Sequence, residues 1–169
     1  MKKISILLMF AFLVGLTVKA QTKKRTHINQ FGLPLITSYP RNVYGGHAQN
    51  NGVVQDKRGF LYFANQEGVL EYDGARWNLI RKTYIQSLSV DSNNIVHVGI
   101  YDGSFGYLKP NEVGELEYVS LSDKLDSITF DSPIYNTHSY NDKTYYCSTS
   151  YIVEAVGDSI TYVAKMPEG

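Results

Sequence analysis

The residues best suited to contact a small ligand form two short polar groups, and each group is followed directly by a glycine. They are Asn65, Gln66 and Glu67 in the first group and Tyr101 and Asp102 in the second. Amides and carboxylates exchange hydrogen bonds with polar ligands, and a tyrosine ring offers a flat apolar surface. Because polar residues before a glycine are typical of turns, we expect both groups in loops at one rim of the fold, where binding residues are often found.

Two of these residues are acids at matching positions, since Glu67 precedes Gly68 and Asp102 precedes Gly103. A pair of converging carboxylates is what an exported enzyme that cleaves glycans would require. Turn formation is the simpler role for both acids. The sequence contains no glycine-rich phosphate loop, no His-Glu-x-x-His pattern and no Gly-x-Ser-x-Gly pattern. We therefore predict no catalytic residue and no enzymatic activity for this chain.

The histidines and the single cysteine give no metal or cofactor signal. The histidines are His27, His47, His97 and His138, and their spacing would not gather them on one ion. His97 lies in an apolar segment, so we expect a buried, hydrogen-bonded imidazole. Cys147 has no partner for an internal disulfide and is expected to be buried in a strand. No metal site and no cofactor are predicted.

An aromatic set raises the alternative of a sugar-stacking platform. Its members are Trp77, Tyr62, Tyr72, Tyr101 and Tyr107. Aromatic rings of this kind also fill the space between packed sheets, and we favour that role for the set.

Composition indicates a globular β protein. Of 169 residues, 43% are hydrophobic and only 19% are charged, which is too few charges for a disordered tail. Fourteen tyrosines and fourteen glycines favour strands joined by tight turns. The pI near 6.9 gives no reason to expect contact with a nucleic acid.

The first twenty residues are typical of a secretory signal peptide. Lys2 and Lys3 precede a thirteen-residue apolar stretch, residues 4–16, and small residues precede an expected cleavage before Gln21. The alternative is an uncleaved N-terminal anchor, although the stretch is short for a membrane span. Cleavage would leave 13 basic and 16 acidic residues. We therefore predict an exported protein with an N-terminal tail at residues 21–33.

The remaining sequence repeats itself. Residues 56–64 align with residues 91–99 at an offset of 35, and the alignment continues with Gly68 over Gly103 and Tyr72 over Tyr107. Each copy has the pattern strand, Asp-led turn, strand, Gly-bearing turn, strand. Asp56 and Asp91 can bond the backbone two residues on.

The pattern predicts four short strands in each of three units. They are 53–55, 60–64, 69–72 and 77–80, then 86–90, 95–99, 104–108 and 116–121, then 134–139, 143–148, 151–155 and 159–163. A further strand is expected at residues 34–39. Four antiparallel strands per repeat favour three blades of an incomplete β-propeller within residues 34–169, at about 50–83, 84–130 and 131–166. A plain β-sandwich with a chance internal match is the alternative.

Two runs identify a family resemblance. They are VVQDKRGFLYFANQEGVLEYDGARWNLI (residues 53–80) and SFGYLKPNEVGELEYVSL (residues 104–121). These runs resemble the two-component-regulator propeller repeats of periplasmic sensors in hybrid histidine kinases and related helix-turn-helix regulators, which often carry a triple-tyrosine domain after the propellers. One departure is the stretch at residues 49–52, where such repeats usually have an aromatic residue. The resemblance implies a sensory module that recognises a small ligand, with oligosaccharides as one class.

Three blades are fewer than the four to eight that usually close a propeller. We therefore expect two open, apolar outer faces that are covered by remaining blades of the same protein or by other copies. We expect this chain to be the front part of a larger protein. Any contact with a membrane would come from parts of that protein outside this chain. The first hypothesis is a periplasmic sensor portion. The alternatives are an exported glycan-cleaving propeller and a self-assembling scaffold or adhesion module.

Overall fold

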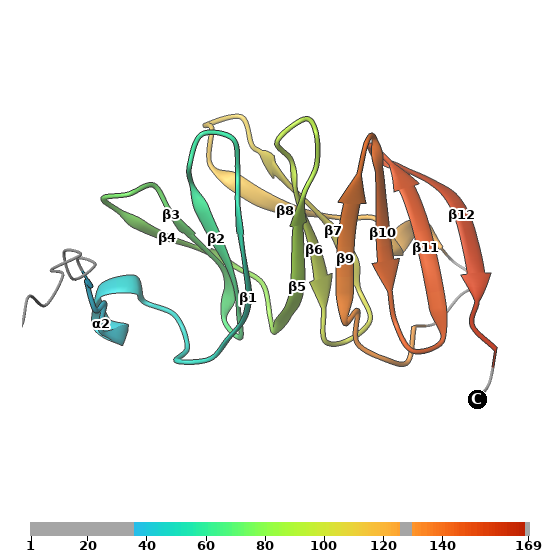
Figure 1. Cartoon of the computed structure of the whole chain (residues 1–169), viewed down its shortest axis with the longest axis horizontal. Coiled ribbons are helices and arrows are strands. Elements are labelled where there is room, and N and C mark those ends of the chain that lie inside the picture. Colours follow the sequence, from blue (N-terminus) through green and yellow to red (C-terminus); the bar gives the residue numbers. More distant parts are fainter. Residues whose placement is uncertain (1–35, 126–129, 168–169) are drawn as a thin grey trace, which may run out of the picture. The chain divides into compact units, whose positions relative to one another are not determined.

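The computed structural model describes residues 36–125 and 130–167, and these residues form an all-β fold. Strands account for 52% of the described residues and helices for 5%, which confirms the expected all-β class. Each predicted unit forms one antiparallel sheet of four strands that follow their order in the sequence (Figure 1). The expected signal peptide at residues 1–20 and tail at residues 21–33 lie outside the described residues.

The strands lie within a few residues of the predicted bounds. The first sheet contains β1 (Asn50–Gln55), β2 (Leu61–Asn65), β3 (Gly68–Tyr72) and β4 (Trp77–Arg81). The second contains β5 (Ile85–Val90), β6 (Val96–Ile100), β7 (Phe105–Pro110) and β8 (Leu116–Ser120). The third contains β9 (Asn136–Tyr140), β10 (Lys143–Cys147), β11 (Tyr151–Val156) and β12 (Ser159–Lys165). A two-sheet sandwich would divide these strands differently, so that alternative does not describe the fold.

The strand expected at residues 34–39 is wrong for its described part. Residues 36–39 form no strand, and a single helical turn, α2 (Arg41–Tyr44), follows them. Pro40 lacks the N–H that a sheet requires, and Gly45 ends the helical turn at a φ of 72°. A short 3-10 turn, η1 (Ser122–Lys124), follows the second sheet.

The Asp-led turns form by the mechanism that the sequence predicted. Asp56 Oδ1 accepts hydrogen bonds from the backbone N–H groups of Arg58 (2.9 Å) and Phe60 (3.0 Å). Asp91 Oδ1 does the same for Asn93 (2.9 Å) and Ile95 (2.8 Å). The two repeats therefore reverse direction with the same hydrogen bonds, although the other residues of the two turns differ.

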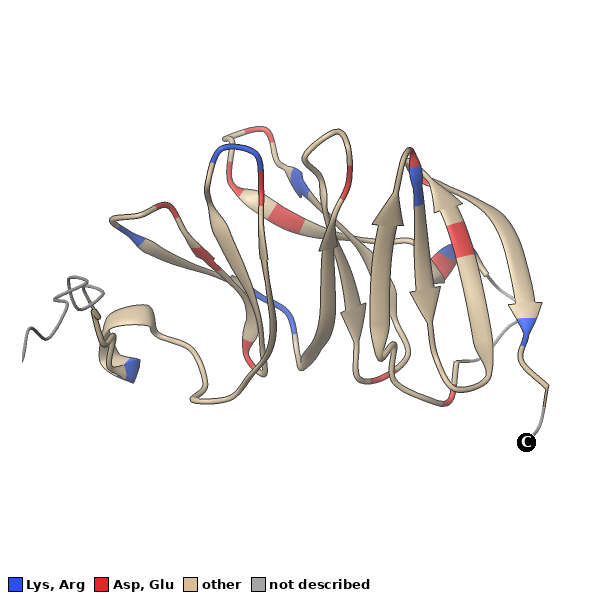
Figure 2. Cartoon of the chain, viewed as in Figure 1, with Lys and Arg blue, Asp and Glu red and all other residues tan. Residues whose placement is uncertain are grey.

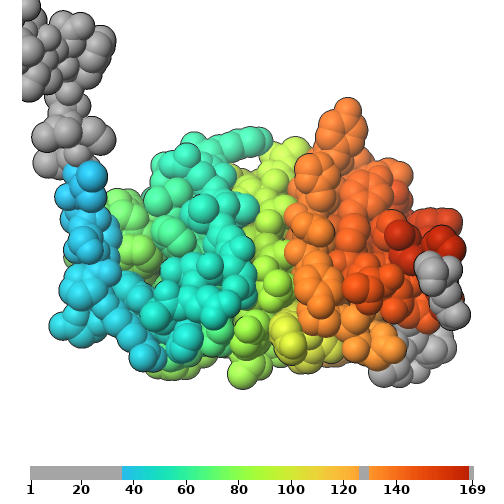
Figure 3. Space-filling model, turned by 60° about the horizontal axis from the view of Figure 1, so that its bottom comes forward, coloured from blue at the N-terminus to red at the C-terminus, as the bar shows by residue number. Residues whose placement is uncertain are grey.

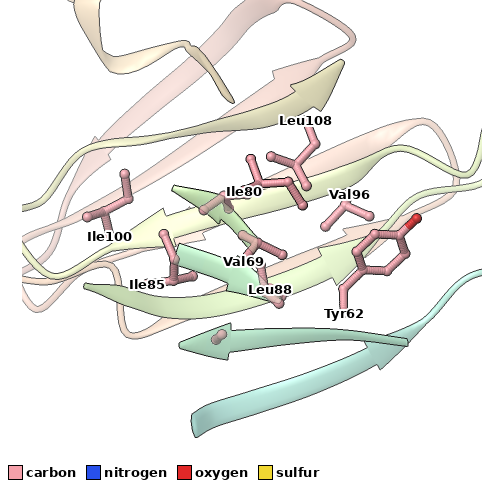
Figure 4. Packing of buried hydrophobic residues seen from close by; sticks show 10 residues of the cluster. Tyr62, Val69, Ile80, Ile85, Leu88, Val96, Ile100 and Leu108 are labelled. Atoms are coloured by element: carbon pink, nitrogen blue, oxygen red, sulfur yellow. The ribbon is translucent and has the colours of Figure 1, made fainter. Parts of the chain in front are cut away.

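An apolar core lies between the first and second sheets. Figure 4 shows its residues, which come from alternate positions of both sheets: Tyr62, Ala64, Val69, Ile80, Ile85, Leu88, Val96, Val98, Ile100 and Leu108. Each buried side chain of this size contributes about 1.5–3 kcal/mol relative to an exposed one. The first two sheets are therefore held together chiefly by hydrophobic burial.

The contact between the second and third sheets is polar along the inner strands, unlike the apolar contact between the first and second sheets. β1, β5 and β9 stand next to one another in that order (Figure 1). Between β5 and β9, Ser87 Oγ lies 2.8 Å from Thr137 Oγ1, and Ser89 Oγ lies 2.8 Å from Ser139 Oγ. A separate apolar cluster around Phe105 and Tyr146 fills the outer part of this contact. Hydroxyl pairs thus replace aliphatic contacts along the inner strands.

The repeat alignment is shifted by one residue after the second strand of each sheet. Tyr62 pairs with Glu71 in the first sheet, whereas His97 pairs with Tyr107 in the second. The β6–β7 turn contains one residue more than the β2–β3 turn, and this extra residue moves every later residue by one position. The expected equivalence of Tyr72 and Tyr107 is therefore wrong, because Glu71 occupies the place that corresponds to Tyr107. The match of Gly68 with Gly103 fails in the same way, since Ser104 holds the place of Gly68 opposite the second strand.

The two outer faces differ from the expectation that both are apolar. On the first sheet, the segment before β1 lies against the outer face (Figure 3), where Trp77 stacks on Tyr72 with ring centroids 4.5 Å apart. On the third sheet, the outer face carries an ion pair between Lys143 and Glu154 at 3.0 Å and the exposed Tyr140. Figure 2 shows charges of both signs distributed over the described residues, mostly in turns and at strand ends.

Candidate functional site

The structure brings the two predicted polar groups to the same rim. The β2–β3 turn contains Gln66 and Glu67, and the β6–β7 turn contains Tyr101 and Asp102. Both turns join the second strand of a sheet to its third strand, so both lie at the same end of neighbouring sheets. This end is opposite to the Asp-led turns, which join the first and second strands.

Tyr84 connects the two turns through its backbone. Its N–H donates to the Gln66 carbonyl oxygen at 2.9 Å, and its own carbonyl oxygen accepts from the Tyr101 N–H at 3.0 Å. Its φ of 46° is a left-handed value that is uncommon for a tyrosine. Two backbone hydrogen bonds and the start of β5 hold this conformation, and strained residues of this kind cluster at functional sites.

The side chains continue the same connection. The Tyr84 and Tyr101 rings lie 4.6 Å apart between centroids at an angle of 52°. Gln66 Nε2 donates to Gln49 Oε1 at 2.8 Å and lies 3.4 Å from the Tyr84 hydroxyl. Tyr101 remains 53% exposed. We call Gln49, Gln66, Tyr84 and Tyr101 the rim cluster, because it combines an accessible aromatic ring with two carboxamides.

Asn65 supports the rim and does not face solvent. It is fully buried, and its Oδ1 accepts from the N–H groups of His47 (2.8 Å) and Glu67 (3.0 Å). Its Nδ2 lies within hydrogen-bonding distance of the His47 and Gln49 carbonyl oxygens and of Asn50 Oδ1. Because its polar atoms are occupied within the protein, Asn65 positions the turn beside the segment at 47–50.

The two predicted acids have separate partners. Glu67 Oε1 accepts from Arg41 Nη2 at 2.8 Å, and Glu67 Oε2 lies 4.0 Å from Arg81 Nη1. Asp102 Oδ1 accepts from the Ser104 N–H at 2.8 Å and so shapes its own turn. Among the described residues the two carboxylates have no hydrogen-bond partner in common, so the glycan-cleaving alternative gains no support from their contacts.

Sequence reasoning missed Tyr84 and Gln49. Tyr84 lies between the last predicted strand of the first unit and the first predicted strand of the second, and no repeat partner drew attention to it. The sequence feature that could have identified Tyr84 is an aromatic residue directly before a strand. The connection between the first two sheets also has to pass the rim that holds the β2–β3 and β6–β7 turns. Gln49 lies in the stretch where the related repeats usually have an aromatic residue, so a polar side chain stands there in this chain.

The aromatic set does not form one platform. Tyr62 is in the core between the first two sheets, and Tyr107 faces the third sheet. Trp77 contacts Tyr72, Phe63, Tyr39 and Tyr44, which are on the first sheet or in the segment before it. Packing therefore explains most of the set, as favoured from the sequence, and only Tyr101 belongs to the rim cluster.

His97 is buried as expected, whereas the expected full burial of Cys147 is wrong, because Cys147 lies at the end of β10 and stays partly exposed. His97 is 2% exposed and hydrogen-bonded, as expected from the sequence. Cys147 is half-buried, and burial raises the pKa of its thiol. Among residues 36–125 and 130–167, no group of three or more His, Cys, Asp or Glu side chains is placed to hold a metal ion.

Two cavities of the described residues are lined by residues outside the rim cluster. One cavity of about 280 Å³ lies between the first two sheets near Arg58 and Asn94, at the opposite rim. Another of about 520 Å³ runs between β4 and β8, beside Arg81 and Tyr118. None of the four rim-cluster residues lines either of these two cavities.

Comparisons with known proteins leave these residues as the basis for any functional argument. A scan against protein-family models finds no match, and a search of the curated proteins finds none either. Within the described parts of the chain, no helix has the length and hydrophobicity needed to cross a membrane.

Proposed function

We propose that this chain is a ligand-sensing β-propeller portion of a bacterial two-component-type signalling protein, exported to the periplasm. The observation that carries the proposal is the succession of three four-stranded antiparallel sheets, packed face to face in chain order with their first strands side by side. Propeller blades are arranged in this way, and a ring closes with four to eight of them. The resemblance of residues 53–80 and 104–121 to two-component-regulator propeller repeats supports the sensory role.

The proposed ligand site is the rim cluster, extended by Asp102. An oligosaccharide is the ligand class that fits it best, because one sugar face can stack on the exposed Tyr101 ring. The carboxamides of Gln49 and Gln66 can exchange hydrogen bonds with the sugar hydroxyls. Since the Tyr84 backbone bonds both turns, a ligand held there would favour one arrangement of the first two sheets over others. Such a ligand-dependent shift in packing is the proposed signal.

Further sheets, supplied by the same polypeptide or by other copies, would complete the ring, and the remaining parts of the signalling protein would carry the shift across the membrane. This chain is proposed to have no catalytic role. It is also proposed to make no contact with nucleic acid.

Binding can be tested with a panel of neutral and acidic oligosaccharides and isothermal titration calorimetry. Tyr101→Ala and Gln66→Ala should weaken binding, the former about tenfold if stacking contributes about 1.4 kcal/mol. Tyr140→Ala is the matched control, because Tyr140 is a 65% exposed tyrosine on the outer face of the third sheet. If Tyr101→Ala and Tyr140→Ala lose affinity equally, or no probe binds the folded chain, the rim site is refuted.

Export can be tested independently of the ligand. The complete chain should be produced in a Gram-negative host and its periplasmic fraction analysed by mass spectrometry. A product that begins at Gln21 is expected. A cytoplasmic product that retains Met1 would refute the periplasmic assignment and leave the binding test unaffected.

A further inference from the structure

His97 occupies a buried position between the second and third sheets, with a hydrogen-bond partner at each ring nitrogen. Nε2 lies 3.2 Å from Asp91 Oδ2, in the turn before β6. Nδ1 lies 2.8 Å from the Tyr146 hydroxyl, which belongs to β10 of the third sheet. The Tyr146 hydroxyl also lies 2.9 Å from the Gly106 carbonyl oxygen. One chain of contacts therefore joins Asp91, His97, Tyr146 and Gly106.

When His97 is neutral, these four groups have too few hydrogens to make all of their contacts as hydrogen bonds at once. An ionised Asp91 only accepts, so the neutral ring places its single hydrogen on Nε2. Nδ1 is then an acceptor and takes the Tyr146 hydroxyl hydrogen, which leaves none for the Gly106 carbonyl. When the ring is protonated, both nitrogens donate, and the Tyr146 hydroxyl turns to donate to Gly106. The same heavy-atom positions thus support two hydrogen arrangements that differ by one proton.

We propose that His97 is a pH-dependent latch between the second and third sheets, in the sense that protonation reverses the direction of the hydrogen bond between His97 and Tyr146. In the neutral form, β6 accepts a hydrogen bond from the third sheet through Nδ1 of His97. In the protonated form, β6 donates to Tyr146 instead, and Tyr146 donates to β7. Uptake of one proton therefore reverses the direction of the contact and places a positive charge inside the contact between the sheets.

The surroundings determine how readily the proton is taken up. Burial lowers the pKa of His97, and the hydrogen bond and charge of Asp91 oppose this effect only in part. Tyr107 of β7 faces the ring with centroids 6.2 Å apart. On β5, the pairing partner of His97 is Ser89, whose hydroxyl bonds Ser139 of β9. Among the described residues, Asp91 is the one charged group acting on the ring.

The sign of the effect on stability follows from this lowered pKa. Between the lower folded-state pKa and the ordinary value near 6.5, the unfolded chain binds more protons than the folded chain. Stability is complete above about pH 6.5 and decreases as the pH falls toward the folded-state pKa. The loss in the folding equilibrium constant is about tenfold for each pH unit that separates the two pKa values.

The decisive experiment is a pH titration of the complete chain by long-range nitrogen–proton NMR of the histidine rings. The His97 signals can be assigned from their displacement in Tyr146→Phe. We expect the Nε2–H tautomer at neutral pH and protonation of both nitrogens only below the ordinary histidine pKa near 6.5, because burial lowers the pKa of His97. A neutral ring with its hydrogen on Nδ1 would overturn the proposal. A His97 ring that stays neutral until the protein unfolds would overturn it as well.

A stability measurement checks the same proposal without NMR. Urea unfolding should be followed at several values between pH 7.5 and pH 5 for the unmodified chain, for His97→Gln and for His138→Gln. The titrating side chain is absent in His97→Gln, so its stability should change less over this range. The exposed His138→Gln should follow the unmodified chain. Equal pH dependence in all three proteins would refute the latch. If His97→Gln fails to fold, the tautomer observed in the unmodified chain decides the question.

Discussion

Replacing Asp56 by asparagine should destabilise the chain substantially, although the two side chains have the same shape. The Asp56 side chain is fully buried, and its Oδ2 faces four donors. They are Arg58 Nη2 at 2.7 Å, Arg58 Nε at 2.8 Å, Asn94 Nδ2 at 3.2 Å and the Tyr62 hydroxyl at 3.3 Å. In Asp56→Asn, an NH2 group would take the place of Oδ2 or of Oδ1, where the backbone N–H groups of Arg58 and Phe60 donate. Either orientation sets donors against donors.

The magnitude can be worked from these contacts. Hydrogen bonds to a charged group contribute about 1.5–3 kcal/mol, and breaking a buried ion pair costs about 3–5 kcal/mol. Arg58 is 56% exposed, so water can solvate much of its released charge, and the cost should stay at the lower end of these ranges. We expect Asp56→Asn to lower the free energy of unfolding by about 2–3 kcal/mol.

Urea unfolding measures this loss, because Trp77 is the one tryptophan of the chain and lies in the same sheet as Asp56. With a slope of about 1–3 kcal/mol per molar urea, the midpoint should fall by about 0.7–3 M. Asp73→Asn is the matched control, since Asp73 leads an exposed turn and accepts only backbone hydrogen bonds, from Ala75 and Arg76. A midpoint change no larger for Asp56→Asn than for Asp73→Asn would refute the reasoning.

The same contacts predict acid sensitivity. Burial by itself raises the pKa of Asp56, but hydrogen bonds from Arg58 and from the Phe60 N–H outweigh it, so the pKa lies below its ordinary value. Since the folded-state pKa is depressed, this contribution is complete above about pH 4 and is lost as the pH falls through the folded-state pKa. In acid titrations below pH 4, Asp56→Asn should therefore lose less further stability than the unmodified chain.

Two further outcomes are expected. Gly99→Ala should lower the free energy of unfolding by about 1–3 kcal/mol, because a methyl group there would overlap Ser87 Oγ. Gly52→Ala should change it little, because the position of the added Cβ is open space. Equal urea midpoints for the two variants would contradict this account of the contact between the second and third sheets. The Cys147 thiol should react with iodoacetamide at pH 7 more slowly in the native chain than in urea, because burial raises its pKa; equal rates, followed by mass spectrometry, would show that burial does not protect it.

Local chemistry was predictable where a single residue determines the turn. Asp56 and Asp91 were identified as turn residues from their spacing alone, because an aspartate that bonds the backbone two residues on needs no distant partner. The strands were predictable for the same reason, since their apolar character and flanking turns are local features. The one-residue shift at the β6–β7 turn was not predictable, because Tyr107 matches Tyr72 in type while the extra turn residue places it on the opposite face.

The candidate site was predictable only in part. Gln66 and Tyr101 were chosen as polar or aromatic residues in loops, and the structure brings them together. Asn65 is also a polar loop residue, yet the segment at 47–50 occupies the hydrogen-bonding atoms of its amide. No repeat pattern predicts this contact, because that segment lies outside the aligned repeats. Tyr84 was missed because its role depends on a backbone conformation at φ 46° and on two turns from different sheets.

The different inner contacts of the three sheets have a consequence for how the chain responds to cold. Hydrophobic burial weakens as temperature falls, whereas hydrogen bonds between hydroxyl groups do not share that dependence. β1 meets β5 through aliphatic side chains such as Val54 and Leu88, while β5 meets β9 through Ser87, Ser89 and their hydroxyl partners. On cooling, the inner contact of the first sheet should therefore loosen before that of the third. The temperature at which the protein works would then set which pair of sheets moves most easily.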